Sequence, residues 1–197
     1  MKEQLIIALS REHGSGGHVI AEKLAEQYQI PFYDKNLLNH IADEKSVNVA
    51  ELDKYDEKPR HKLFTRTIRG YTNSPEENIA QMQFEFLKRK ADAGDSFVIV
   101  GRCAEHVLRD NPNMISIFVL GNTETKIVRI MERDEVSREE AEKLMRQTDK
   151  ERSSYYNHHC PSKWGNARNH ELSINSSKLG LDETARIIAE YINSRRK

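Results

Sequence analysis

The glycine-rich stretch near the N-terminus contains the residue types best suited to chemistry. An apolar run leads into residues 10–18, which carry glycine at positions 14, 16 and 17. Glycines at this spacing allow a compact, partly left-handed turn whose successive N–H groups converge on an anion. A helical apolar pattern follows, and the positive end of a helix strengthens anion binding. The stretch predicts a phosphate-binding loop whose nucleotide-binding residues are His13, Gly14, Ser15, Gly16, Gly17 and His18.

The end of this loop departs from the standard phosphate-binding pattern. A standard P-loop ends in Gly-Lys-Ser/Thr, whereas Gly17 and His18 stand at the two positions after Gly16. The phosphate lysine and the magnesium-binding hydroxyl are therefore both absent. Arg11 or His18 could replace the charge of the lysine, and a cation at the transferring phosphoryl group is worth about 10³–10⁵ in rate.

Two further predicted strand ends add polar residues to the same edge of the sheet. Open α/β sheets bind ligands at the carboxyl ends of their strands. Asp34 follows one strand, where it either orients an acceptor or a metal-bound water, or caps the next helix. Arg102 follows Gly101 at another strand end, where it either grips a phosphate with two hydrogen bonds or forms a structural ion pair.

The elements that must position these residues alternate along the chain. Helical patterns separate short apolar runs, which predicts an α/β fold with a parallel sheet. Ser74 with Glu77, and Ser137 with Glu140, have the capping-box spacing that starts a helix. The strands are expected at residues 4–9, 30–33, 96–100, 115–120 and 171–175.

Two long segments between strands carry clustered basic residues. The first includes Arg66 and Arg69 beside aromatic residues, a composition that suits either the monophosphate of an acceptor nucleotide or an exposed loop. The second includes Arg146, Asp149 and Arg152, whose spacing of three keeps them near one helical face. These charges suit either donor phosphates or a solvated, salt-bridged helix surface.

Residues 10–38 resemble the start of the cytidylate-kinase-like family, a divergent branch of the P-loop nucleoside monophosphate kinases, and residues 98–108 and 139–180 support the resemblance. It implies a three-layer α/β/α P-loop NTPase fold with a five-stranded parallel sheet in one domain, residues 1–197. Within it, the acceptor-binding insertion would span about 35–93 and the lid about 134–170.

The resemblance also implies an activity, namely transfer of a phosphoryl group from ATP, with Mg²⁺, to a nucleoside monophosphate such as CMP or dCMP. Nucleotides are then the expected partners. Arg146 and Arg152 would carry an RxxxDxxR-like lid motif with a slightly shorter first spacing. The expected catalytic residues are Arg11, Asp34, Arg102, Arg146 and Arg152, and the expected substrate-binding residues are Asp34, Arg66, Arg69 and Arg102.

Composition excludes several other classes of protein. Lysine and arginine together number 31, as do aspartate and glutamate, so general nucleic-acid binding is not expected. No signal peptide or long apolar span appears and the two cysteines are far apart, which predicts a cytoplasmic protein with reduced thiols and no membrane association. A homo-oligomer stays possible. His158, His159 and Cys160 are adjacent and no fourth ligand follows at suitable spacing, so no metal site is expected there.

Two alternative functions follow from the missing lysine and from the unknown acceptor. Gly17 and His18 suit a catalytically impaired nucleotide-binding or sensor protein. A kinase with another small acceptor would use the same donor site. A purely structural interaction protein would leave the polar residues at the three strand ends unexplained.

Overall fold

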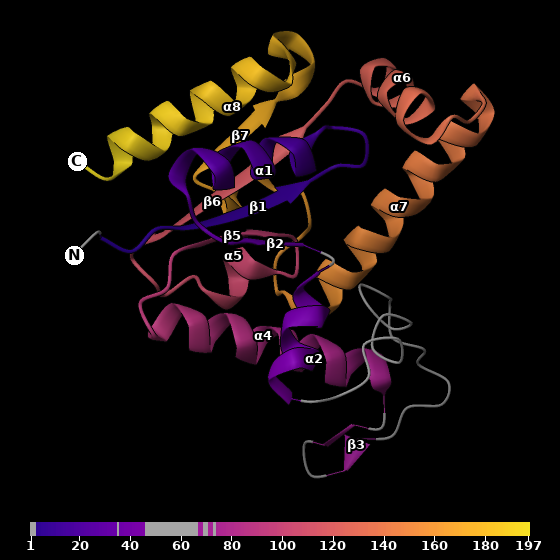
Figure 1. Ribbon diagram of the computed structural model, residues 1–197. Coiled ribbons are helices and arrows are strands. Elements are labelled where there is room, and N and C mark those ends of the chain that lie inside the picture. The colour runs from indigo at the N-terminus through magenta and orange to yellow at the C-terminus, as the bar shows by residue number, and fades with distance from the viewer. Residues whose placement is uncertain (1–2, 35, 46–66, 69–70, 73) are drawn as a thin grey trace.

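A five-stranded parallel sheet forms the centre of the molecule (Figure 1). The computed structural model describes residues 3–34, 36–45, 67–68, 71–72 and 74–197. The strands lie in the order β2-β5-β1-β6-β7, and each pairs in parallel with its neighbour. The five strands and the parallel sheet predicted from the sequence are therefore confirmed. Their bounds are β1 Ile6–Arg11, β2 Phe32–Tyr33, β5 Phe97–Val100, β6 Met114–Leu120 and β7 Leu172–Asn175.

Helices cover both faces of the sheet because successive side chains of the buried strands point to opposite faces. Ile7 and Leu9 of β1 pack with α1 and α8, whereas Ile6 and Ala8 pack with α2, α4 and α5. The result is the expected three-layer α/β/α arrangement (Figure 1). The helices are α1 Gly17–Tyr28, α2 Leu37–Lys45, α4 Pro75–Asp92, α5 Ala104–Val107 and α8 Ser176–Arg195.

Two further helices lie at the edge formed by the carboxyl ends of the strands. They are α6, Thr123–Asp134, and α7, Arg138–His159. The predicted capping box at the start of α7 is present, since Ser137 Oγ accepts the Glu140 N–H and the Ser137 N–H donates to the Glu140 carboxylate at 3.1 Å. From there α7 runs past the strand ends to the level of α2 and α4 (Figure 1). This helix therefore borders the edge to which the sequence assigns the active site.

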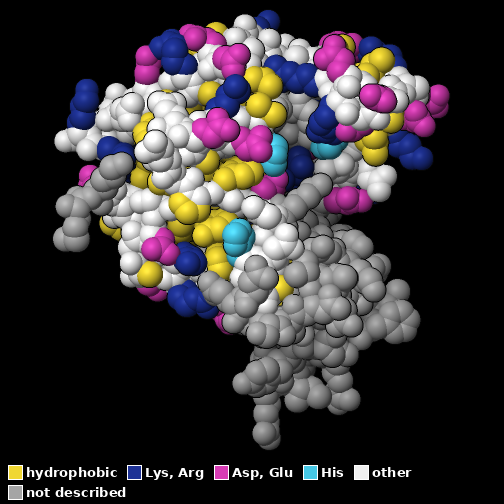
Figure 2. Space-filling view, viewed as in Figure 1, with side chains coloured by type: hydrophobic (Ala, Val, Ile, Leu, Met, Phe, Trp, Pro, Cys, Tyr) yellow, Lys and Arg dark blue, Asp and Glu magenta, His cyan; other side chains and the backbone are white. Residues whose placement is uncertain are grey.

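The chain between β2 and β5 carries α2, a small antiparallel pair formed by β3, Thr67–Ile68, and β4, Tyr71–Thr72, and then α4. Ser74 caps α4, because its Oγ accepts the Glu77 N–H at 3.5 Å. In the part of the chain that the structure describes, no helix is both long and apolar enough to span a membrane. Basic and acidic side chains intermingle over the face shown in Figure 2, in keeping with the net charge of zero.

Candidate active site

The glycine-rich loop joins β1 to α1 and has the predicted left-handed geometry. Gly14 and Gly16 have φ values of +77° and +79°, and a Cβ at Gly14 would lie 2.7 Å from the Lys126 carbonyl oxygen. Neighbouring elements hold the loop in place, since the Ser15 carbonyl accepts hydrogen bonds from Ser176 Oγ at 2.5 Å and from the Arg129 guanidinium at 3.1 Å. The loop is thus anchored to α6 and to the start of α8 rather than lying free.

Packing explains why glycine stands at the position of the P-loop lysine. A Cβ on Gly17 would lie 2.5 Å from the Cβ of Arg11 and 3.2 Å from a methyl group of Leu9. Atoms at 2.5 Å overlap strongly, so any side chain at position 17 would have to displace the strand end. The side chain of Arg11 therefore starts in the space where a lysine at position 17 would begin.

Lys126 is a buried cation beside the donor loop, and sequence reasoning missed it. Its Nζ lies 3.0 Å from Glu12 Oε2 and 3.4 Å from Asp149 Oδ2, and the residue is only 7% exposed. Glu12 also accepts the Gly121 N–H at 3.1 Å. Because Lys126 belongs to α6, an ammonium reaches the loop from a segment far along the chain.

A carboxylate of α7 accepts a hydrogen bond from a backbone N–H of the loop. Asp149 Oδ1 accepts the His13 backbone N–H at 2.6 Å, while Oδ2 faces Lys126. Burial raises the pKa of Asp149, although the His13 hydrogen bond and the charges of Lys126 and Arg152 act in the opposite direction. Asp149 is therefore an internal anion bound where the sequence predicts a phosphate.

Asp34 forms the second part of the site at the end of β2. His18 Nδ1 lies 2.6 Å from Asp34 Oδ2, and Arg11 Nη2 lies 3.7 Å from Oδ1. Burial alone would raise the pKa of Asp34, but the His18 hydrogen bond and the charges of Arg11 and Arg102 together lower it. The same hydrogen bond raises the pKa of His18. Asp34 is thus held as a carboxylate at neutral pH.

Arg102 occupies an unusual backbone position at the end of β5. Gly101, Arg102 and Cys103 have φ values of +77°, +56° and +53°, so three consecutive residues are left-handed. Side chains other than glycine adopt this conformation at an energetic cost, and such strain is concentrated at functional sites. Arg102 is also 1% exposed, and its charge acts on Asp34. The strained turn thereby buries a guanidinium beside a carboxylate.

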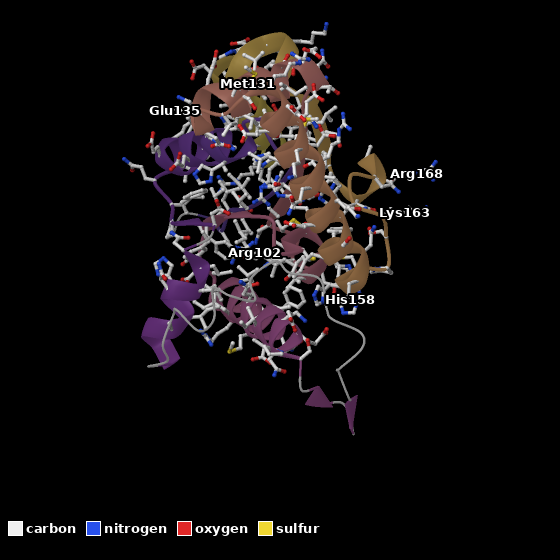
Figure 3. All side chains as sticks on the ribbon, turned by 90° about the vertical axis from the view of Figure 1, so that its right-hand side faces the viewer. Arg102, Met131, Glu135, His158, Lys163 and Arg168 are labelled. Carbon is white, nitrogen blue, oxygen red and sulfur yellow. The ribbon has the colours of Figure 1, made fainter. Side chains whose placement is uncertain are left out.

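A cavity of about 20 Å³ separates these strand ends from α7. Arg11 and Arg102 line it from the sheet, and Arg152 lines it from α7, with its Nη1 3.4 Å from the Arg11 carbonyl oxygen. Figure 3 shows Arg102 near the centre of this side of the molecule, behind α7. A volume of this size holds about one water molecule. Since a nucleotide needs far more room, α7 must move or its side chains must repack before a nucleotide can enter.

The charges around this cavity favour an anionic ligand. The exposed fraction is 7% for Arg11, 1% for Arg102, and 16% for the Arg152 side chain. Glu105 lies nearby, with its Oε2 3.4 Å from Ser10 Oγ, and burial raises its pKa. Three guanidinium groups in a low-dielectric setting can bind a polyanion such as a nucleotide phosphate.

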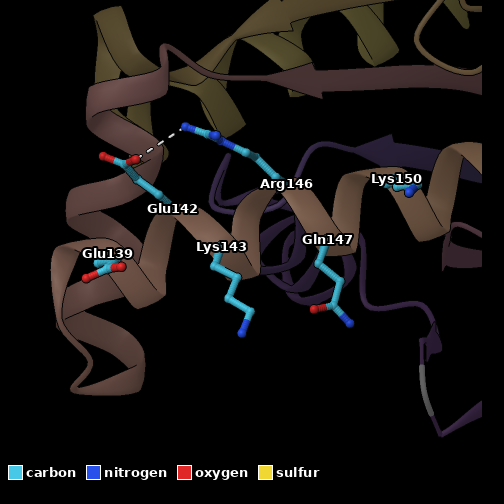
Figure 4. A pocket seen from close by; sticks show the side chains of 6 residues that line it. All are labelled: Glu139, Glu142, Lys143, Arg146, Gln147 and Lys150. Atoms are coloured by element: carbon cyan, nitrogen blue, oxygen red, sulfur yellow. Dashed lines mark hydrogen bonds and ion pairs between the residues drawn. The ribbon is translucent and has the colours of Figure 1, made fainter.

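Other expected site residues lie elsewhere. Arg146 is on the outer side of α7, where its side chain is 76% exposed and its Nη2 lies 3.3 Å from Glu142 Oε2 (Figure 4). Arg66 and Arg69 lie outside the described residues.

His13 lies in the glycine loop itself. Burial and the charges of nearby arginines lower the pKa of His13 to about 4, so its imidazole is neutral at pH 7.

Asp34 also fits the requirements of a magnesium ligand. Its Oδ1 is buried and accepts no hydrogen bond from the residues that the structure describes. Carboxylate oxygens are the protein ligands that Mg²⁺ prefers, and one or two of them suffice when phosphates supply the rest. Asp34 could therefore hold Mg²⁺ or orient a hydroxyl group of the acceptor.

Comparisons with known proteins show which proteins this chain resembles in sequence and fold. A cytidylate kinase from Pyrobaculum neutrophilum is 24% identical over 189 residues, covering 95% of this chain and 92% of that protein. The solved structure of an uncharacterized protein from Eubacterium ventriosum is 41% identical, with a TM-score of 0.78, and covers 97% of this chain and 99% of that one.

A shikimate kinase structure from Bacteroides thetaiotaomicron, at 14% identity and a TM-score of 0.57 over 96% of this chain and 98% of its own, shares the fold. The model of the Cytidylate kinase-like family matches residues 6–178, which is most of the chain. Together with the glycine loop and the topology of the sheet, this match shows that the chain belongs to the cytidylate kinase-like family of P-loop kinase folds.

Proposed function

We propose that this protein transfers the γ-phosphoryl group of ATP to a nucleoside monophosphate, with CMP or dCMP as the acceptor and Mg²⁺ as the metal. The observation that carries the proposal is a hydrogen bond from the glycine loop to a carboxylate of the protein itself, the side chain of Asp149. Asp149 holds the His13 N–H at 2.6 Å and lies 3.4 Å from the Lys126 ammonium. A phosphate oxygen would find the same two donors.

On the donor side, Lys126 is the proposed substitute for the missing P-loop lysine. It supplies a buried ammonium beside the loop, and Arg152 of α7 supplies a guanidinium nearby. A cation that touches the transferring phosphoryl group stabilises the charge that develops there. Arg146 is not needed in this arrangement.

On the acceptor side, Arg102 and Arg11 would bind the acceptor phosphate and Asp34 would orient the acceptor. The oxygen that attacks in a nucleoside monophosphate is already anionic, so no general base is required. Catalysis then depends on alignment and on neutralisation of charge. A site built from buried arginines around a small cavity suits this division of labour.

Asp34 would also be the residue that holds Mg²⁺, directly or through a metal-bound water, and the ion when bound would neutralise phosphate charge. In the same proposal residues 1–197 form one kinase-like domain. Residues 35–93, which carry α2 and α4, would bind the acceptor, and residues 134–170, which carry α7, would act as the lid.

The experiment is a two-stage measurement on the purified chain. Thermal shifts with and without Mg²⁺ identify which nucleotides bind, and chromatography then follows conversion of each nucleoside monophosphate to its diphosphate in the presence of ATP. Formation of CDP or dCDP supports the proposal. A thermal shift with ATP but no product from any acceptor would contradict transfer and favour a nucleotide-binding protein. The tight packing at Gly17 and the hydrogen bond between His13 and Asp149 also suit that alternative. Product from a different acceptor would overturn the specificity alone.

A further inference from the structure

A second group of side chains that can bind a metal lies away from the candidate active site. It forms where the last turn of α7 meets the first turn of α4. His158 Nε2 lies 2.9 Å from Glu77 Oε2, and His159 Nδ1 lies 3.9 Å from Glu77 Oε1. Figure 3 shows His158 at the end of α7 that borders α4. One ligand atom from each of the three residues lies within 4.8 Å of the other two.

The three side chains form a donor set that suits zinc. Two imidazole nitrogens and a carboxylate oxygen bind Zn²⁺ at about 2.0–2.2 Å, which places ligand atoms of a tetrahedral site about 3.3–3.5 Å apart. The two histidine nitrogens lie 2.9 and 3.9 Å from the two different oxygens of the Glu77 carboxylate, on both sides of that value. All three ligand atoms lie within 4.8 Å of one another, close to the spacing that one ion requires.

Hydrogen bonding between these residues accounts for only part of the arrangement. His158 is within hydrogen-bond distance of Glu77, but His159 Nδ1 at 3.9 Å is beyond it. The His159 ring packs against Phe84 and Tyr155, with ring centroids 5.5 and 4.6 Å away. The ring thus packs between aromatic side chains on the side away from solvent, with Nδ1 3.9 Å from the carboxylate.

The His159 side chain is only 8% exposed. It therefore faces Glu77 from the interior of the helix junction, whereas a ligand on the open surface would have no such enclosure.

We propose that Glu77, His158 and His159 bind a divalent transition-metal ion of the Zn²⁺ class, with water completing its coordination. Cys160 follows the two histidines in the sequence, but the third member of the group is Glu77, which the fold brings from 81 residues away. Because the ligands belong to α4 and α7, the ion would join the start of one helix to the end of the other. The site lies outside the proposed phosphate-binding residues, so it is independent of the proposed function.

The test is metal binding by the whole chain, purified without a histidine tag and freed of metal by a chelator. Co²⁺ is the spectroscopic probe, because four-coordinate Co²⁺ has intense visible bands, and Zn²⁺ should displace it. Calorimetry with Zn²⁺ should give one ion per chain. The variants are His158→Ala, Glu77→Gln and His159→Gln, and the matched control is His106→Gln, which changes a half-exposed histidine elsewhere.

Each of the three variants should weaken Zn²⁺ binding at least about 10-fold, because even the loss of a residue that only supports a metal ligand has an effect of this size. Each should also remove the visible Co²⁺ bands. The control should bind as the unchanged chain does. If buried His159→Gln fails to fold, His158→Ala and Glu77→Gln decide the question. Absence of Zn²⁺ binding, or equal binding by the unchanged chain and these two variants, would overturn the proposal.

Discussion

Replacing Asp149 by alanine should tighten the binding of ATP. In the structure the Asp149 carboxylate accepts the His13 N–H at 2.6 Å and lies 3.4 Å from Lys126 Nζ. A phosphate can use these donors only after the carboxylate has left. A hydrogen bond to a charged group contributes about 1.5–3 kcal/mol, and this is the interaction that the ligand must break. Since 1.4 kcal/mol corresponds to a factor of ten, the variant should bind ATP about 10- to 100-fold more tightly.

The same substitution should have a smaller effect on the stability of the free protein. The raised pKa of Asp149 means that the native state takes up a proton more readily than the unfolded state, so the charged carboxylate costs stability at neutral pH. Loss of the hydrogen bond and relief of this cost then oppose each other. The free energy of unfolding should therefore change less than the free energy of ATP binding.

Calorimetric titration with Mg²⁺ and a non-hydrolysable ATP analogue measures the affinity directly. Glu151→Ala is the matched control, because Glu151 is an exposed carboxylate on the same helix. Unchanged or weaker affinity in a folded Asp149→Ala protein would refute the idea that this carboxylate occupies the phosphate position.

Three further predictions concern the cations and the pH dependence of the site. Lys126→Met should lower the rate of phosphoryl transfer about 10³-fold or more, because it removes a cation that contacts the phosphate. The control Lys143→Met changes an exposed lysine and should leave the rate unchanged. Equal rates in the two variants would remove Lys126 from the site. Arg102→Lys should lower kcat/KM about 10- to 100-fold, because lysine lacks the planar fork for two parallel hydrogen bonds, and a wild-type value would argue against phosphate contact. His18 has a raised pKa, so its pairing with Asp34 stabilises the fold fully below pH 6.5 and less as the pH rises through that raised pKa. His18→Gln should therefore flatten the pH dependence of the melting temperature above pH 6.5, and an unaltered slope would contradict this.

Local patterns predicted the elements that are fixed by local chemistry. The left-handed glycines, the capping box at Ser137 and the five strands all follow from residues close together in the chain. Arg102 was identified because it follows a glycine at a strand end. Its left-handed backbone was not foreseen, since the sequence gives no sign that a non-glycine residue will adopt this conformation.

The partners of the loop could not be predicted in the same way. Lys126 lies in α6 with the composition of an ordinary helix surface, and only the tertiary structure buries it beside Glu12. Arg146 and Arg152 are six residues apart, which on a helix separates their directions by about 120°. Arg152 consequently faces the strand ends, while Arg146 points to solvent. Residues three apart on a helix point in only roughly the same direction, so two successive steps of three moved Arg152 away from the side of Arg146.

The most direct test of the account is the conversion of nucleoside monophosphates by the unchanged protein. The chain is incubated with ATP and Mg²⁺ and with CMP, dCMP, UMP, AMP or GMP in turn, and chromatography separates the nucleotide products. We predict formation of ADP together with CDP or dCDP, at a rate that falls when Lys126 is replaced by methionine. Failure of the protein to bind ATP, together with no diphosphate product from any acceptor, would contradict the proposal that this site is a nucleotide kinase.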